Sequence, residues 1–178
     1  SRGLGDVYKR QIVESAGSTS VAETGTTDTF TVVLTAQPVS DVVLTVTSSD
    51  TGEATVNSPL TFTPLNWNTA QTVTVTGVDD NLIDGTISST ITVSVNDGSS
   101  DNNFDSLADQ TVTATTTDDD VAGFTIAQTG GSTAVAETGT TDTFTIVLNA
   151  QPASDVVLTV TSSAVSYTHL TLPTKRIV

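Results

Sequence analysis

Apolar and polar residues alternate with a period of two along most of the chain. Phe30, Val32 and Leu34 alternate with threonines, which places three apolar side chains on one face of an extended segment. The same alternation recurs in residues 42–47, 60–62, 73–75, 91–95, 112–114 and 124–126. Turn-forming clusters separate these runs at residues 37–38, 48–52, 79–85 and 97–103. The pattern therefore predicts about seven short β-strands per 110 residues, the size of an immunoglobulin-like antiparallel β-sandwich. Trp67 and the phenylalanines are the expected large core residues.

The chain repeats itself with a period of 114 residues. Residues 21–49 and 135–163 can be aligned over 29 positions, and only Val32/Ile146, Thr35/Asn149 and Val39/Ala153 differ. We therefore expect one complete all-β repeat at residues 12–120 and the first part of a second repeat at residues 121–163. With only the first strands of a sandwich, the second repeat is not expected to fold stably alone.

The register of the repeat ends abruptly on both sides. Residues 1–11 and 164–178 match nothing in the other copy, and they contain all five Lys and Arg residues and the only His. These ends resemble adapter-derived tails translated in metagenomic assemblies, and we interpret both as foreign. The alternative is that they are genuine caps of a repeat array, because terminal repeats are usually atypical.

Composition and charge narrow the classes of function. Residues 12–163 contain 35 Thr, no Lys or Arg and 19 of the 20 acidic residues. Nothing in them could neutralise phosphate, so we expect no nucleic-acid partner, and no apolar run is long enough for membrane insertion. The chain has no Cys, and its single His169 lies in the suspect tail. We therefore expect no enzyme, although paired carboxylates could in principle cleave glycosides.

The acidic residues gather in loops that a sandwich would bring to one pole. Glu23 lies in the early VAETG segment, Asp50 lies between two strands, Asp79, Asp80 and Asp84 share one loop, and Asp118, Asp119 and Asp120 end the repeat. Carboxylates about 5 Å apart repel one another by a few kcal/mol at an effective dielectric near 20. No Lys or Arg in the repeat can relieve this repulsion, whereas Ca²⁺ takes six to eight oxygen ligands from such loops.

These segments together resemble the Calx-beta domain of sodium/calcium exchanger regulatory regions, integrin β4 and large bacterial surface proteins. The motifs that carry the resemblance are VAETG, TSSDTGEA, VTVTGVDDNLIDG and TTTDDDVAGFTI, and they span the whole repeat. The resemblance implies calcium ligands at Glu23, Asp50, Asp80, Asp84, Asp118, Asp119 and Asp120, with the carbonyl of Leu82 as a possible addition. Exchanger domains often carry several Glu near position 84, so Asp84 implies a weaker site or fewer ions.

In the second repeat Glu137 matches Glu23, but Ala164 replaces the Asp50 equivalent, so no complete second site is expected. Asp97, Asp101 and Asp105 lack the spacing and the closing Glu of an EF-hand, and we interpret their loop as a polar turn or an auxiliary calcium site.

The sequence thus predicts a calcium-binding module that stiffens a repetitive extracellular or cell-surface protein, such as an adhesin. Its partners would be calcium ions and neighbouring repeats, with a cell-surface or glycan ligand bound through other domains. Two alternatives stay open. The repeat could be a metal-free spacer whose acids only solvate its surface, or its threonine rows, such as Thr72, Thr74 and Thr76, could bind a glycan or ice directly.

Overall fold

The computed structural model describes residues 10–163, and within them the chain is built from strands and short turns. The first repeat contains β1 (Arg10–Glu14), β2 (Thr19–Ala22), β3 (Thr27–Leu34), β4 (Val42–Ser48), β5 (Ala54–Val56), β6 (Leu60–Phe62), β7 (Gln71–Gly77), β8 (Ile87–Val95) and β9 (Gln110–Thr117). The second repeat adds β10 (Phe124–Gln128) and β11 (Phe144–Leu148). Three 3₁₀ turns lie at Ser15–Gly17, Asp97–Ser99 and Thr129–Gly131. No helix in this part of the chain is long and apolar enough to cross a membrane.

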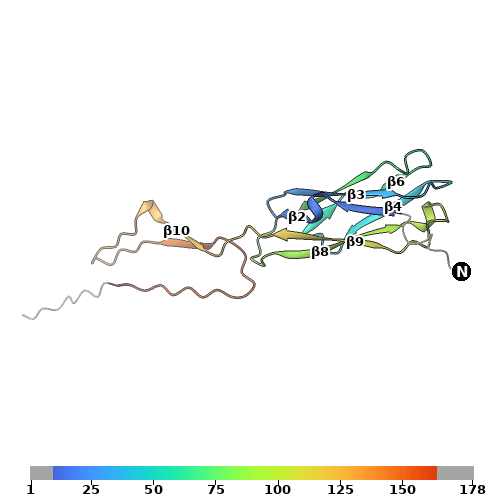
Figure 1. Cartoon of the computed structure of the whole chain (residues 1–178). Helices are drawn as coiled ribbons and strands as arrows, with labels where there is room; N and C mark the ends of the chain where they lie inside the picture. Colours follow the sequence, from blue (N-terminus) through green and yellow to red (C-terminus); the bar gives the residue numbers. More distant parts are fainter. Residues whose placement is uncertain (1–9, 164–178) are drawn as a thin grey trace, which may run out of the picture.

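Two sheets of the first repeat pack face to face as a β-sandwich (Figure 1). One sheet has the strand order β1-β3-β7-β5 and the other has the order β2-β9-β8-β4-β6. The predicted sandwich is confirmed, with two differences. The short strands β1, β2 and β5 were not among the predicted runs. In addition, β2 pairs with β9 in parallel, whereas the other pairings are antiparallel.

The alternating apolar residues form the core between these sheets. Phe30, Val32, Leu34, Val42, Leu44, Phe62, Val73, Val75, Ile91 and Val93 are among the buried members. Trp67 is half-buried and packs against this core. The phenylalanines of the first repeat, Phe30, Phe62 and Phe104, are buried, whereas Phe124 and Phe144 in the second repeat are exposed.

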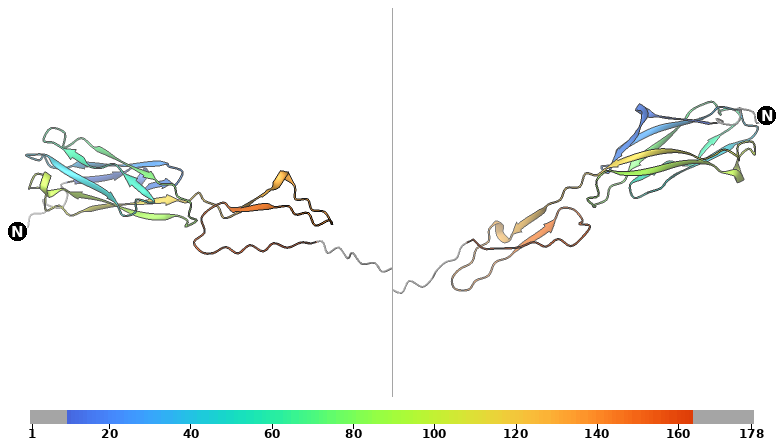
Figure 2. Two further views of the ribbon diagram at one scale, coloured as in Figure 1. Left: turned by 180° about the vertical axis from the view of Figure 1, so that it is seen from behind. Right: turned by 60° about the horizontal axis from the view of Figure 1, so that its bottom comes forward.

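The second repeat continues beyond one end of the sandwich (Figure 2). β10 and β11 pair with Phe124 opposite Leu148, which is the register of Arg10 opposite Leu34 in β1 and β3, 114 residues earlier. Residues 155–163 form no strand. Of the two segments interpreted as foreign, the structure describes only Arg10 and Gln11, which begin β1. The rest, including Ala164 and His169, lies outside the described residues. Arg10 is buried, and its guanidinium donates to the Ala108 carbonyl at 2.6 Å and to Gln110 Oε1 at 3.0 Å.

Candidate metal centre

Acidic side chains from four segments meet at the end of the sandwich that leads to the second repeat. We call this set the acidic pole, and its members are Glu23, Glu53, Asp80, Asp84, Asp118 and Asp120. Glu23 directly follows β2, Glu53 directly precedes β5, Asp80 and Asp84 lie in the β7–β8 loop, and the last two follow β9. The ends of β2 and β9 therefore lie beside the junction (Figure 1).

Backbone hydrogen bonds position Glu23 at the base of this pole. Its amide donates to the Thr117 carbonyl at 3.1 Å, which extends the parallel β2–β9 pairing by one residue. The turn after it is closed by Gly25, whose φ of +80° favours glycine. The turn then packs against the end of β7, where Gly77 donates to the Thr26 carbonyl at 3.0 Å. A Cβ at Gly77 would overlap the Ala22 carbonyl, so only glycine permits this approach.

Glu53 is a member of the pole that the sequence analysis missed. Asp50, the acid predicted from the same loop, is exposed and accepts a hydrogen bond from the Gly52 amide at 2.9 Å. This is an Asx-turn, for which Asp-Thr-Gly is a sequence signal. The turn directs Glu53 inward, and its carbonyl accepts from the Val78 amide at 2.9 Å and from Thr116 Oγ1 at 3.2 Å. Glu53 is consequently buried, with 6% of its surface exposed.

Asp118 ties two loops of the pole together. Its Oδ2 accepts from the Gly85 amide at 2.8 Å and from the Asp84 amide at 3.1 Å, and its Oδ1 accepts from the Asp120 amide at 2.7 Å. These backbone donors stabilise the carboxylate and lower the pKa of Asp118. Asp118 therefore remains charged and fixes Asp84 and Asp120 at the pole.

The pole contains two overlapping groups of carboxylates in which the potential ligand atoms lie within 4.8 Å of one another. One group is Glu23, Glu53 and Asp84, and the other is Glu23, Asp80 and Asp120. Glu23 belongs to both groups and is 1% exposed. Both of its carboxylate oxygens lack a hydrogen-bond partner, as do Glu53 Oε2 and Asp120 Oδ2. Buried polar atoms without partners are costly, so this arrangement calls for a bound cation or a proton.

The electrostatics of the pole agree with this geometry. Burial, together with the charges of Asp118, Asp80 and other acids, raises the pKa of Glu23 to about 7. Burial and neighbouring acids such as Asp84 also raise the pKa of Glu53, and the same causes raise that of Asp120. The described residues supply no salt bridge to this end of the sandwich, and Arg10, their one Lys or Arg, bonds instead to Ala108 and Gln110.

The structure sorts the ligands implied by the family resemblance. It brings Glu23, Asp80, Asp84 and Asp120 together in the two groups and gives Asp118 a role in holding the loops. Asp50 and Asp119 are exposed and belong to neither group. Leu82 is half-buried, and its amide donates to Asp80 Oδ1 at 2.6 Å. The order of acids along the chain cannot distinguish a carboxylate that binds backbone amides from one that points into the pole.

The EF-hand-like loop is organised as a polar turn. Asp101 is buried, its Oδ2 accepts from the Val39 amide at 2.6 Å, and its Oδ1 accepts from the Asn103 amide at 3.0 Å. These donors lower the pKa of Asp101. Its oxygens already have partners, and neither carboxylate group contains Asp97, Asp101 or Asp105.

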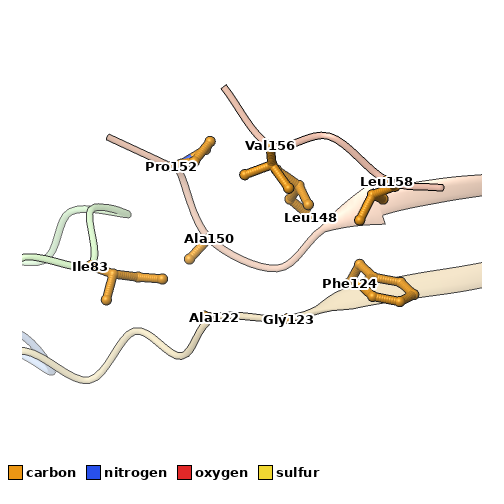
Figure 3. A pocket seen from close by; sticks show the side chains of 9 residues that line it. All are labelled: Ile83, Ala122, Gly123, Phe124, Leu148, Ala150, Pro152, Val156 and Leu158. Carbon is orange, nitrogen blue, oxygen red and sulfur yellow. The ribbon is translucent and has the colours of Figure 1, made fainter. Parts of the chain in front are cut away.

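The β7–β8 loop of the pole also touches the second repeat. The Gln151 amide donates to the Asn81 carbonyl at 2.6 Å, and Leu82 forms an isolated parallel bridge with Gln151. The next residue, Ile83, lies across from Ala150 and Pro152 in an apolar pocket (Figure 3). One loop thus carries two carboxylates of the pole and the contacts at the junction.

The donor set of the pole fits a hard divalent cation. It consists of carboxylate oxygens from loops, and the described residues contain no His or Cys that would favour zinc or copper. Glu23, Glu53, Asp80, Asp84 and Asp120 would supply the protein ligands, and a cation among them would neutralise carboxylates that now repel one another. Ca²⁺ accepts such irregular oxygen sets more readily than Mg²⁺ does.

No family model matches the chain, and no curated protein matches it. Solved structures with a similar fold include the E. coli chaperone DraB, 6% identical over 66% of this chain and 59% of its own, with a TM-score of 0.46. The calcium binding domain CBD12 of CALX1.1 is 16% identical over 62% of this chain and 45% of its own, at a TM-score of 0.40. The apo-form Calx CBD1 domain is 13% identical over 62% of this chain and 98% of its own, at a TM-score of 0.39. These likenesses are distant, and the interpretation of the pole rests on its own geometry.

Proposed function

We propose that the first repeat is a calcium-binding structural module in which Ca²⁺ is held at the acidic pole. The observation that carries this proposal is Glu23, a fully buried carboxylate whose two oxygens have no partner and face acids from three other segments. A cation is the ligand that satisfies these oxygens without protonating them. In this proposal the module has a structural role and not an enzymatic one.

Calcium at this position would stiffen the junction between repeats. Asp80 and Asp84 lie on either side of Leu82 and Ile83, which contact the second repeat at Gln151 and Pro152. Fixing the two carboxylates therefore restricts the loop that carries the contact. A chain of such repeats would become a rod when calcium is bound.

We place this module in an extracellular or cell-surface repetitive protein, such as an adhesin, with any target bound by other domains. Extracellular modules bind calcium with dissociation constants of about 0.1–1 mM, and calcium outside cells reaches this range. The absence of Cys and the acidic surface agree with such a location.

Thermal unfolding of the full chain in chelator, in millimolar Ca²⁺ and in equal Mg²⁺ tests the binding. We expect Ca²⁺ to raise the melting temperature well beyond Mg²⁺, because only Ca²⁺ gains from an irregular set of carboxylates. Equal shifts with both ions would mean that the acids are a screened surface, which would leave the metal-free spacer as the function. Small-angle X-ray scattering with and without Ca²⁺ then tests the stiffening, and an unchanged maximum dimension and distance distribution would contradict it.

Direct recognition of a glycan or of ice has less support. The threonines at 72, 74 and 76 lie in β7, a central strand whose alternate residues Val73 and Val75 are fully buried in the core. Their arrangement is that of the outer face of an ordinary sheet. Binding to a glycan array or to ice that persists in chelator would favour this function over the calcium module.

A further inference from the structure

The second repeat exposes an apolar groove between its strand pair and the segment that follows. The groove is lined by Phe124, Ile126, Phe144, Ile146, Leu158 and Val160. Figure 3 shows the neighbouring pocket at the junction, which shares Phe124 and Leu158 with this groove. Several of these side chains are largely open to solvent, including Phe124 and Ile126, which are about half exposed. An apolar surface of this kind marks an interaction site or an incomplete core.

The first repeat shows what covers the same surface. Phe144, Leu158 and Val160 are 39%, 40% and 66% exposed, whereas their copies Phe30, Leu44 and Val46 are at most 3% exposed. Those copies share one core cluster with Val73 and Val75 of β7, Ile91 and Val93 of β8, and Val112 and Ala114 of β9. In the first repeat, this apolar surface is therefore covered by strands β5–β9, which follow residue 48.

The strand edges of the second repeat are open where that set would pair. β3 pairs with β1 on one side and with β7 on the other, over Thr27–Val32. Its copy β11 pairs with β10 and with no other described strand. Residues 156–162 copy β4, which pairs with β6 and β8, yet they form no strand. The unpaired edge and the apolar groove thus require the same missing strands.

We propose that residues 124–160 form an acceptor site for a polypeptide segment that carries the β5–β9 strand set, supplied from outside the described chain. The occupant is a run of short strands in which Val or Ile alternates with Thr or Ser, as in residues 54–117. It binds with β7 against the free edge of β11 and with β8 against residues 156–162, in the registers of the first repeat. The bound product is a complete second sandwich.

Part of one strand edge in the acceptor is already arranged for this occupant. β10 and β11 keep the register of β1 and β3, and residues 144–146 of β11 copy residues 30–32, which pair with β7 in the first repeat. Binding would bury apolar side chains that are now hydrated and would satisfy the open edge with hydrogen bonds. Because residues 21–49 and 135–163 are nearly identical, the segment that fits the first acceptor also fits the second.

Hydrogen exchange of the full chain, with and without an added peptide of residues 50–121, tests the proposal. We expect protection at residues 124–160 to rise about tenfold or more, while residues 10–117 keep their own protection. A peptide of the same composition in scrambled order is the control. No change at residues 124–160, or equal protection by the scrambled peptide, would overturn the proposal.

A matched pair of variants identifies the face that binds. Phe144→Asp places a charge in the groove, and we expect the affinity for the peptide to fall at least about tenfold. Thr145→Asp places the same charge on the opposite face of β11 and should change the affinity less than about twofold. Both residues are exposed, so neither substitution disturbs the first repeat. Equal loss in both variants, or self-association of the chain through residues 124–160 that excludes the peptide, would contradict the proposed occupant.

Discussion

Residues 19–48 and 133–162 have almost the same sequence but different structures. In the first copy, β2, β3 and β4 are strands with a buried face, and Glu23 is 1% exposed. In the second copy, residues 144–148 alone form a strand, and Glu137, the copy of Glu23, is exposed. The retained strand corresponds to Phe30–Leu34, the part of β3 that pairs with β1. The repeated sequence therefore forms a strand only where a neighbouring strand is present to pair with it.

The two copies nevertheless keep the same local turns. The Ala22 amide donates to Thr26 Oγ1 at 2.7 Å, and the Ala136 amide donates to Thr140 Oγ1 at the same distance. The turn closed by Gly25 is repeated at Gly139, again with positive φ. Bonds that span a few residues survive without the other strands, whereas burial and the acidic pole do not.

The largest expected difference between the copies is in the cost of removing a phenylalanine. Phe30→Ala should destabilise the first repeat by about 3–5 kcal/mol, because Phe30 is fully buried in the core. Phe144→Ala should change the stability by less than about 1 kcal/mol, because its side chain is exposed. Chemical denaturation of the two variants measures both values. Similar losses would show that the second copy has a packed core.

The next effect is a loss of stability with rising pH in the absence of metal. The unfolded chain releases the Glu23 proton near pH 4.5, whereas the folded chain holds it until about pH 7. The folded form binds more protons in this window, so its stability should fall by about 2–3 kcal/mol between these values. The raised pKa of Glu53 and that of Asp120 act in the same direction.

Below this window the stability changes with pH in the opposite direction. Asp118 has a lowered pKa in the folded chain, so the stability that its charge provides is lost as pH falls below about 3.8. Thermal melts from pH 3 to 8 in chelator should therefore peak in mild acid, and Ca²⁺ should abolish the decline toward pH 7. A Glu23→Gln variant that keeps the full decline would show that Glu23 is not its cause.

A smaller effect is expected in the response to calcium, where Glu23 and its copy Glu137 should differ. At a tenfold excess over its dissociation constant, Ca²⁺ should stabilise the folded chain by about 1.4 kcal/mol. Glu23→Gln should remove this gain, because Glu23 belongs to both carboxylate groups, and should stabilise the metal-free form at pH 7. Glu137→Gln is the matched control and should leave the gain intact. Isothermal titration calorimetry gives the affinities, and identical affinities for the two variants would contradict the assignment of Glu23 as a ligand.

The smallest difference is expected between neighbouring aspartates of the exit loop. Asp120→Asn should weaken calcium binding several-fold, because Asp120 is a member of a carboxylate group and has an unpartnered buried oxygen. Asp119→Asn should change it less than about twofold, because Asp119 is exposed and interacts only at longer range. Calcium titrations of the two variants make the comparison, and a larger effect at Asp119 would mean that the loop rearranges when the ion binds.

Much of the site was foreseeable from the motifs, and the rest depended on orientation. The loops that carry Glu23, Asp80, Asp84 and Asp120 were predicted to meet because a sandwich gathers alternate connections at one end. Glu53 was missed because its role depends on the Asx-turn of Asp50, which uses one acid and turns the next one inward. Asp118 was predicted as a ligand, and the structure shows it bound to three backbone amides.

The sequence by itself determined the properties that depend on neighbouring residues. Alternation with period two defined the longer strands, clusters of turn-forming residues defined the connections between them, and the 114-residue period defined the repeat. Only the tertiary structure decided which acids of the pole are buried without a partner, as Glu23 is, and which bind backbone amides, as Asp118 does. The physical reason is that burial depends on the packing of distant strands, and the repulsion felt by Glu23 comes from acids in other loops, such as Asp80 and Asp118, up to about 95 positions away. The strands β7, β8 and β9 beside those loops cover the first copy alone among the described residues.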